Sequence, residues 1–324
     1  MEEIIEFQVG EEDASLRLDL FLYDKLEGWS RSKCQELIRR GKVRVEGRVV
    51  VKPAHVVKVR ERVEVILEPA KKEEALLPEN IPIEIIYEDN EIVVVNKQAG
   101  LVVHPAPGHL HGTLVNALIY HCKDYFTSGD PLRPGVVHRL DMNTTGVLVF
   151  AKNPRAYLEL RRQVENREFK RRYLALVKGV PLYKKGIIDA SIGRSLADRK
   201  KMSVTGVNSK DAVTSYSVKE IFGELSLLEL ELSTGRTHQI RVHLKFIGHP
   251  VIGDPVYGFI DYGALKLSRS LIKSLENLPG QALHAQLLGI KHPITNEYME
   301  FTAPLPRYFE DILNLLRQEF VPQG

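Results

Sequence analysis

The first seventy residues of the chain carry two kinds of hydrophobic pattern. Apolar residues recur at helical spacing in two segments, and the second segment lies between Ser30, a typical N-cap residue, and Gly41, a typical stop. Apolar and polar residues then alternate on both sides of Glu46-Gly47, a dipeptide suited to a tight turn. The pattern predicts helices over 16–26 and 31–40, a hairpin over 43–51 and a further strand over 60–67.

The rest of the chain carries short apolar runs with few helical patterns between them. Strands are expected over 83–87, 92–95, 146–151, 172–177, 212–221, 226–232, 282–290 and 298–302. Helices are expected over 113–121, 154–165, 237–247 and 307–317. Because strand signals often follow one another directly, the pattern favours an α+β architecture with a mixed, largely antiparallel sheet over a doubly wound parallel sheet.

A charged segment bracketed by prolines, residues 68–80, separates these two parts of the chain. A chain of 324 residues is long for one domain and suits two. We therefore expect an N-terminal extension over 1–16, a small α/β domain over 17–68, a linker over 69–80 and a larger domain over 81–324.

Positive charge is concentrated in the small domain. Residues 17–62 contain 13 Lys/Arg and 6 Asp/Glu, a net charge of +7, whereas the whole chain carries +3, so the remainder carries −4. A compact basic segment beside a nearly neutral body predicts a polyanionic partner, although a solvated charged surface would give the same count. The candidate contacts are Arg31, Lys33, Arg39, Arg40, Lys42 and Arg44.

Other features argue against several classes of protein. Hydrophobic residues make up 44% and charged residues 27%, which is ordinary for a folded protein, and no run of about 18 apolar residues predicts a membrane span. The acidic start lacks the pattern of a signal peptide, and Cys34 and Cys122 form no CxxC pair, so we expect a cytoplasmic protein. Two pairs of nearby histidines lack the spacing of a metal site, and no nucleotide-binding glycine motif occurs.

The densest group of candidate functional residues is Pro134-Gly-Val-Val-His-Arg-Leu-Asp-Met-Asn-Thr-Thr-Gly, just before a buried strand. A loop held by a rigid strand is a usual position for a functional side chain such as Asp141. A carboxylate can act as a covalent nucleophile where a cation keeps it ionised and correctly aimed. An aspartate that caps a turn or pairs with Arg139 would give the same local sequence.

A second group is Leu232-Ser-Thr-Gly-Arg-Thr-His-Gln-Ile-Arg-Val-His-Leu. On the expected helix, His238, Arg241 and Lys245 share one face, and apolar residues that include Ile240 form the adjacent face. Gly235 permits an anion to approach the helix N-terminus closely. The group offers positive charge to a carboxylate or phosphate, unless it is simply a surface stripe.

A third group, Phe169-Lys-Arg-Arg-Tyr, places Tyr173 beside three basic residues at the start of an expected strand. An aromatic ring next to cations suits stacking on an unpaired base. A tyrosine that only covers the core at a strand edge is the alternative.

Several motifs in order along the chain resemble those of the pseudouridine synthases that modify ribosomal and some transfer RNA uridines. They are His138-Arg-Leu-Asp-Met-Asn-Thr-Thr-Gly, Val95-Asn-Lys-Gln-Ala-Gly-Leu-Val-Val-His-Pro, Thr234-Gly-Arg-Thr-His-Gln-Ile-Arg, Gly248-His-Pro-Val-Ile-Gly-Asp-Pro-Val-Tyr-Gly and Leu283-His-Ala with His292-Pro. Residues 17–67 resemble the S4 RNA-binding module, which agrees with the charge count. His104-Pro-Ala-Pro-Gly and Arg133-Pro-Gly resemble most the D-type enzymes, which act on a stem-loop of large-subunit ribosomal RNA.

This resemblance implies the pseudouridine synthase fold and isomerisation of uridines in large-subunit, 23S-type ribosomal RNA, free or in a precursor particle. Asp141 would attack or otherwise labilise the ribose C1′ of a flipped uridine, Tyr173 would pack against the uracil, and Arg241 would hold Asp141 ionised. The residues expected to bind substrate are Arg139, which would fill the space of the flipped base, and Ile240, His138, Thr144, Arg236 and His238. No metal, redox cofactor or ATP is implied, and the protein is expected to be a monomer.

The physical requirements of the reaction agree with these roles, because a stacked uridine must leave the stack before its glycosidic carbon can be reached. Attack at C1′ and proton abstraction at C2′ both stay open. Two other functions also stay open at this point. One is a carboxylate-dependent N-glycosidase that releases the base, and the other is a non-catalytic RNA-binding or ribosome-assembly protein.

Overall fold

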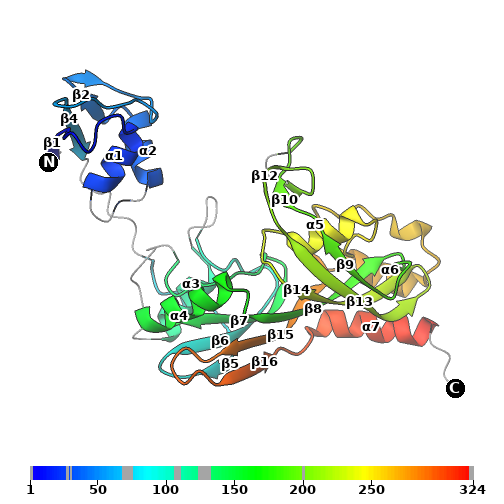
Figure 1. Cartoon of the computed structure of the whole chain (residues 1–324). Helices are drawn as coiled ribbons and strands as arrows, with labels where there is room; N and C mark the ends of the chain where they lie inside the picture. Colours follow the sequence, from blue (N-terminus) through cyan, green and yellow to red (C-terminus); the bar gives the residue numbers. More distant parts are fainter. Residues whose placement is uncertain are drawn as a thin grey trace. The chain divides into compact units, whose positions relative to one another are not determined.

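The computed structural model describes residues 3–26, 29, 31–67, 76–105, 111–122, 133–198 and 201–320. Contacts divide the chain into two compact units, residues 1–75 and 76–324 (Figure 1). Within the described ranges, no helix is both long enough and apolar enough to cross a membrane.

The N-terminal unit combines two helices with a small antiparallel sheet. Its elements are β1 (Glu3–Gln8), α1 (Leu18–Lys25), α2 (Arg31–Arg39), β2 (Val43–Val45), β3 (Arg48–Val49) and β4 (Arg62–Leu67), with strand order β1-β4-β2-β3. Both turn residues of the β2–β3 hairpin, Glu46 and Gly47, have positive φ, as a tight two-residue turn requires. The expected N-cap Ser30 lies outside the described residues.

The first strand of this unit lies in a segment that the sequence pattern treats as an extension. β1 pairs with β4 over its whole length, from Glu3 opposite Leu67 to Gln8 opposite Arg62. The segment 1–16 therefore contributes a strand to the small unit instead of preceding it. The strand was missed because its partner lies about sixty residues away, and a local pattern does not reveal such a pairing.

The C-terminal unit is built on one large sheet. In the described residues, its strand order is β5-β6-β7-β15-β8-β14-β13-β9, and β16 pairs with β15. These strands are β5 (Glu84–Glu88), β6 (Ile92–Lys97), β7 (Thr145–Ala151), β8 (Lys170–Lys178), β9 (Lys185–Asp189), β13 (Val213–Phe222), β14 (Leu225–Leu232), β15 (Leu283–Lys291) and β16 (Tyr298–Thr302). Among them the β7–β15 pair is parallel and the other pairs are antiparallel, which confirms the expected fold class.

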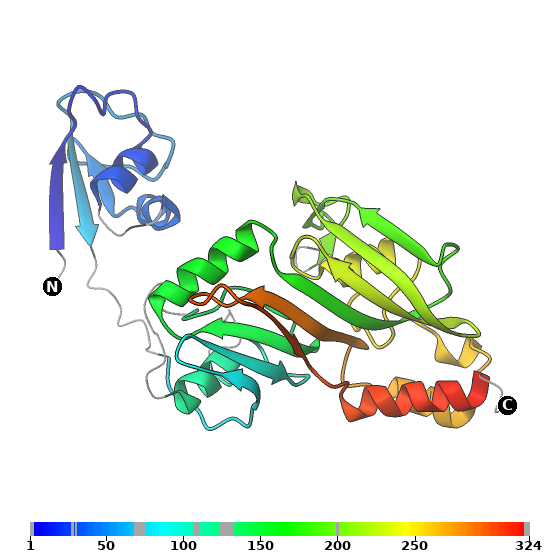
Figure 2. The same cartoon turned by 60° about the horizontal axis from the view of Figure 1, so that its bottom comes forward.

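A three-stranded sheet and five α-helices complete the described part of this unit. The small sheet consists of β10 (Ile192–Arg194), β11 (Met202–Ser203) and β12 (Val207–Lys210). The helices are α3 (Leu114–His121), α4 (Pro154–Glu165), α5 (Gln239–Phe246), α6 (Arg269–Glu276) and α7 (Arg307–Phe320), with a 3-10 turn at Tyr262–Ala264. Figure 2 shows α4, in green, and α7, in red, at separate ends of the large sheet.

The central strands are buried on both faces, and this burial positions the site. Along β8, Tyr173, Ala175 and Val177 pack in one core together with Ile240 and Leu244 of α5. The alternating residues Leu174 and Leu176 pack in a second core against α6 and α7. The face that carries Tyr173 is therefore the face that α5 covers.

Close backbone approach joins the loop before β7 to the rest of the sheet. Gly146 has φ +113°, and a Cβ built there would lie 2.2 Å from the carbonyl oxygen of Ala285 on β15. Only glycine permits this contact. It fixes the end of the loop that carries Asp141.

Candidate active site

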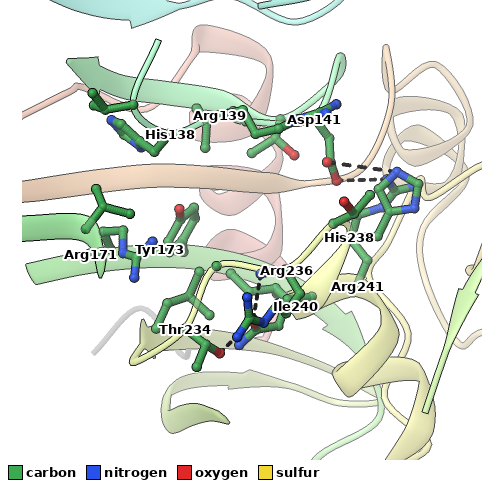
Figure 3. A pocket seen from close by; sticks show the side chains of 18 of the residues that line it. His138, Arg139, Asp141, Arg171, Tyr173, Thr234, Arg236, His238, Ile240 and Arg241 are labelled. Carbon is green, nitrogen blue, oxygen red and sulfur yellow. Dashed lines mark hydrogen bonds and ion pairs between the residues drawn. The ribbon is translucent and has the colours of Figure 1, made fainter. Parts of the chain in front are cut away.

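Three segments that are distant in the sequence meet around one cavity of about 490 Å³. Asp141 comes from the loop before β7, Tyr173 from β8 and Arg241 from α5, and all three line the cavity (Figure 3). A second cavity, of about 290 Å³, also reaches Asp141 and Arg241. The carboxylate is therefore accessible from open space while its loop is held by the sheet.

Asp141 is held by one arginine and keeps one oxygen without a donor. Arg241 Nη1 donates to Asp141 Oδ2 at 2.9 Å, so the two expected partners are in contact. No described residue donates a hydrogen bond to Asp141 Oδ1, and the nearest cationic candidate, His238 Nε2, lies 3.9 Å from it. The Asp141 side chain is 16% exposed. This arrangement can aim one carboxylate oxygen at a bound molecule.

Arg241 is itself fixed by Asp254, a residue to which sequence reasoning assigned no role. Nε and Nη2 of Arg241 donate to the two carboxylate oxygens of Asp254 at 2.7 and 2.9 Å. The guanidinium also lies 5.0 Å from the centre of the Tyr257 ring. Burial works against the charge of Arg241, but the bonds to Asp254 and Asp141 outweigh it and raise the pKa of the guanidinium.

Asp254 is buried, and its remaining hydrogen bonds come from the backbone of its own turn. The amides of Val256 and Tyr257 donate to Oδ1 at 2.9 and 3.0 Å. Burial opposes its ionisation, yet the bonds from Arg241 lower the pKa of Asp254 below its usual value. Asp254 lies in the Gly248–Gly258 motif, so the sequence did mark its segment. The motif did not reveal that Asp254 pairs with Arg241.

Lys97 holds the other side of the Asp141 loop. Its buried Nζ donates to the carbonyl oxygens of Met142, Gln98 and Leu101 at 2.7, 2.9 and 2.9 Å. Burial lowers the pKa of Lys97 to about 7, and the charge of Asp141 opposes that shift. Through Met142, Lys97 ties the residue after Asp141 to β6.

Tyr173 forms an aromatic wall of the cavity and is 7% exposed. Ile240 of α5, also buried, lines the same cavity. Burial raises the pKa of the Tyr173 hydroxyl, so it stays protonated at neutral pH. The two side chains offer a flat ring and an apolar surface to a planar base.

Three of the residues expected to bind substrate use their polar atoms within the protein. His138 Nε2 accepts from the Val149 amide at 3.1 Å, and burial lowers the pKa of His138 to about 3. The Thr144 hydroxyl accepts from Gln281 Nε2 at 2.9 Å. Arg236 Nε donates to the Asp211 carbonyl oxygen at 2.9 Å. All three still line the cavity, but these bonds position loops.

His238 and Arg139 are two further residues that were expected to bind substrate. His238 is not in the helix as expected but precedes it with φ 57°, and its Nδ1 lies 2.8 Å from the Tyr257 hydroxyl. α5 therefore begins at Gln239 instead of 237. Burial lowers the pKa of His238. Arg139 is exposed and borders both cavities.

Cations outnumber acids around the larger cavity. Its lining includes two acidic residues, Asp141 and Glu165, and six arginines: Arg133, Arg139, Arg167, Arg171, Arg236 and Arg241. Clefts lined by one sign of charge concentrate ligands of the opposite sign. The cavity is therefore suited to a polyanion.

The basic residues expected to bind RNA in the N-terminal unit fall into two groups. Arg31 Nε donates to the buried carboxylate of Asp19 at 3.0 Å, so part of its charge is used within the fold. Lys42 is half-buried, whereas Lys33, Arg39, Arg40 and Arg44 are exposed. The exposed group is better placed to meet phosphates.

One cluster in the described residues brings together atom types that can bind a metal, but its charges do not suit a cation. Glu88, His121 and Cys122 bring ligand atoms within 4.8 Å of one another. His121 Nε2 and Lys152 Nζ each lie 2.8 Å from the Glu88 carboxylate. Burial raises the pKa of Cys122 to about 12, so its thiol stays protonated. The Glu88 carboxylate is therefore already paired with the Lys152 ammonium.

Comparison with known proteins shows to which family the chain belongs. A family model described as RNA pseudouridylate synthase matches residues 91–246, and an S4 domain model matches residues 16–63. The chain is 43% identical over 314 residues to an uncharacterized RNA pseudouridine synthase of Bacillus subtilis, covering 97% of this chain and 98% of that relative. It is 40% identical to the ribosomal large subunit pseudouridine synthase D of Haemophilus influenzae, covering 97% of this chain and 95% of that relative.

A solved structure, human RNA pseudouridylate synthase domain containing 4, aligns with a TM-score of 0.55 at 29% identity. The alignment covers 72% of this chain and 93% of the human chain. The chain belongs to the family of RNA pseudouridine synthases, isomerases that convert uridine in RNA to pseudouridine, and it carries an S4 domain. Both family expectations from the sequence are confirmed.

Proposed function

We propose that this protein isomerises uridines in a stem-loop of large-subunit ribosomal RNA, with Asp141 as the group that acts at the ribose. The observation that carries the proposal is the Asp141 carboxylate, held at 2.9 Å by Arg241, lining one cavity with Tyr173. The choice of RNA is supported by likeness to relatives named ribosomal large subunit pseudouridine synthase D at 40–42% identity. We further propose that the protein acts as a cytoplasmic monomer on free or precursor ribosomal RNA.

In the proposed reaction, a uridine leaves its stack and enters the cavity against Tyr173. Asp141 attacks C1′ or removes a proton from C2′, and the N1–C1′ bond breaks. The detached uracil turns, and C5 bonds to C1′ as the Asp141–C1′ bond breaks or, on the other route, as C2′ regains its proton. The hydrogen on C5 then leaves as a proton, and N1 takes up a proton. Arg241 and Asp254 keep the carboxylate aimed throughout, since both are buried and hydrogen-bonded to each other.

Purified protein and large-subunit ribosomal RNA fragments labelled with tritium at C5 of uridine test this proposal. The wild type is expected to release tritium without free uracil, because the base is rejoined to the ribose. The Asp141→Asn variant is expected to bind the same RNA and to release at least about 10⁴-fold less tritium. Free uracil in quantity would indicate an N-glycosidase instead. Binding without turnover on every fragment would indicate an RNA-binding protein.

A further inference from the structure

Arg171 is a buried cation without a partner in the described protein. It lies on β8 two residues before Tyr173, so both side chains project from the same face of the strand and line the larger cavity. Arg171 is 7% exposed, and its Nε is enclosed without a hydrogen-bond partner. No hydrogen bond or ion pair joins its guanidinium to another described residue.

Such an arrangement weakens a fold, because a buried charge normally requires an opposite charge or hydrogen-bond acceptors. An arginine does not escape by losing its proton. The neighbouring loop leaves space for the group, since a Cβ at Gly235 would lie 2.8 Å from Arg171 Nη1. The missing acceptor is therefore expected from a molecule that enters the cavity.

The position of Arg171 relates it to Tyr173 and Asp141. In Figure 3, Arg171 and Tyr173 lie side by side, and Asp141 lies beyond Tyr173 toward the other end of the pocket. Burial raises the pKa of the Tyr173 hydroxyl, the charge of Arg171 lowers it, and the charge of Asp141 raises it. A base stacked on Tyr173 with its ribose at Asp141 would point its far edge at Arg171.

The far edge of uracil is a carbonyl in both orientations that the reaction needs. The ring atom opposite N1 is C4, which carries O4, and the ring atom opposite C5 is C2, which carries O2. A half-turn about the N3–C6 axis exchanges N1 with C5 and O4 with O2. One fixed donor opposite the ribose can therefore bind a carbonyl oxygen before and after the turn.

We propose that Arg171 binds the uracil carbonyl opposite the ribose, O4 in uridine and O2 in pseudouridine, and so retains the base while it is detached. This inference rests on the proposed function and deepens it. When the N1–C1′ bond breaks, its electron pair stays on uracil, and the negative charge spreads over N1, O2 and O4. Arg171 stabilises that charge until C5 bonds to C1′ and the C5 proton leaves. The role is the same for attack at C1′ and for deprotonation at C2′.

The backbone phosphates of the same nucleotide have other partners available. Arg133, Arg139 and Arg167 line the same cavity and are exposed, whereas Arg171 is enclosed. Phosphates remain at the mouth when a base is inserted, so exposed arginines suit them. The buried position of Arg171 favours the base.

A first test compares Arg171→Met and Arg171→Lys with the wild type in single-turnover tritium release at saturating protein. Arg171→Met is expected to slow release about 100-fold at saturating protein, where the rate no longer depends on how tightly the RNA is bound. Arg171→Lys keeps the charge and is expected to lie between. The unfolding temperature of Arg171→Met should not fall, because an unpaired buried charge is removed. A wild-type rate in Arg171→Met overturns this inference alone, and a wild type without tritium release overturns the proposed function.

A second test separates base from phosphate. In the inactive Asp141→Asn background, Arg171→Met is expected to weaken binding of the uridine-containing fragment about tenfold and to leave binding of the same fragment with an abasic target unchanged. Arg167→Met is the matched control, and it should weaken both fragments alike. Equal weakening of both by Arg171→Met would assign Arg171 to phosphate and overturn the proposal, as would no weakening of either.

Discussion

Each unit of this protein contains an aspartate that is hydrogen-bonded to arginine. The two networks differ in whether a carboxylate oxygen is left without a hydrogen-bond donor. Asp19, in the N-terminal unit, is fully buried and accepts from Arg17 Nε and Nη2, Arg31 Nε and Gln35 Nε2 at 2.6 to 3.2 Å. Asp141 accepts from Arg241 alone among the described residues and remains 16% exposed toward the cavity. The first carboxylate is saturated, and the second keeps one oxygen for another molecule.

The difference separates an ion pair whose carboxylate is saturated from one whose carboxylate keeps an open oxygen. A carboxylate whose lone pairs are all occupied stabilises the fold but has nothing to offer a substrate. In the C-terminal unit the saturated member is Asp254, which holds Arg241 so that Arg241 can hold Asp141. Arginine–aspartate contact alone therefore does not identify an active site. Accessibility and an oxygen left without a donor distinguish Asp141 from Asp19 and Asp254.

Among changes to these two networks that leave Asp141 itself in place, the largest effect is expected from a change at Asp254. Asp254→Asn would leave Arg241 buried with a weaker partner and free to turn away from Asp141. We expect single-turnover tritium release to fall about 100-fold, because a misplaced charge in a dry site costs that much. The matched control is Asp261→Asn, an exposed residue nearby in the sequence. A rate for Asp254→Asn equal to that of the control would contradict the positioning role.

A change at Asp19 should alter the stability of the N-terminal unit and not the rate of the reaction. Asp19→Asn is expected to lower the free energy of unfolding of the N-terminal unit by about 2 kcal/mol, because four donors lose a charged acceptor. Trp29, the single tryptophan of the chain, packs on the core of this unit, so its fluorescence during urea unfolding reports the change. Asp24→Asn, at an exposed position, should shift the transition by less than about 0.5 kcal/mol. Equal shifts for both variants would show that the Asp19 network contributes little.

The Asp19 carboxylate should be protonated, and its hydrogen bonds weakened, at low pH only. Hydrogen bonds from Arg17, Gln35 and Arg31 outweigh burial and lower the pKa of Asp19 from 3.8 to about 2. A carboxylate with a lowered pKa stabilises the fold fully above its unfolded value and loses that contribution as pH falls through its folded value. Urea unfolding followed by Trp29 fluorescence should therefore show the free energy of unfolding of the N-terminal unit falling between about pH 4 and pH 2. A titration of Asp19→Asn that follows the wild type throughout this window would argue against Asp19 as the cause.

The smallest effect concerns the surface charges of the N-terminal unit. Replacement of the exposed Lys33, Arg39 and Arg40 by Gln is expected to weaken RNA binding and to make its salt dependence shallower by about 2 in the logarithmic slope. Binding titrations from 50 to 200 mM salt would measure this. Single-turnover release at saturating protein should stay near the wild-type rate. An unchanged slope would remove these residues from the RNA interface.

Periodic and chemically dense parts of the chain were predictable from sequence. The helix Pro154–Glu165 agrees residue by residue with the expectation, because Asn153 caps it and Pro154 suits its first turn. The sequence motifs point to Asp141, Tyr173 and Arg241, and the structure brings all three to one cavity. Side chains alternate along β8, so Tyr173 shares a face with Arg171 and Ala175.

Elements that depend on distant partners were missed. β9 and β12 are short and largely exposed, so they carry little hydrophobic pattern, and they form because β13 and β10 supply hydrogen bonds. The helix Arg269–Glu276 was missed as well, although it buries Leu271 and Leu275. Ser268 caps this helix, so the local sequence did carry a start signal for it.

The amino-acid sequence by itself determined the class of fold, the reactive groups and the basic N-terminal module, because residue type and local spacing carry that information. Only the tertiary structure decided which groups are partners. In that structure Arg241 binds Asp254 as well as Asp141, Lys97 is buried against the loop that carries Asp141, and the described residues supply no acceptor to Arg171. Such pairings depend on distances between atoms from separate strands and helices, and the free energy of a buried charge depends on its surroundings rather than on its neighbours in the chain.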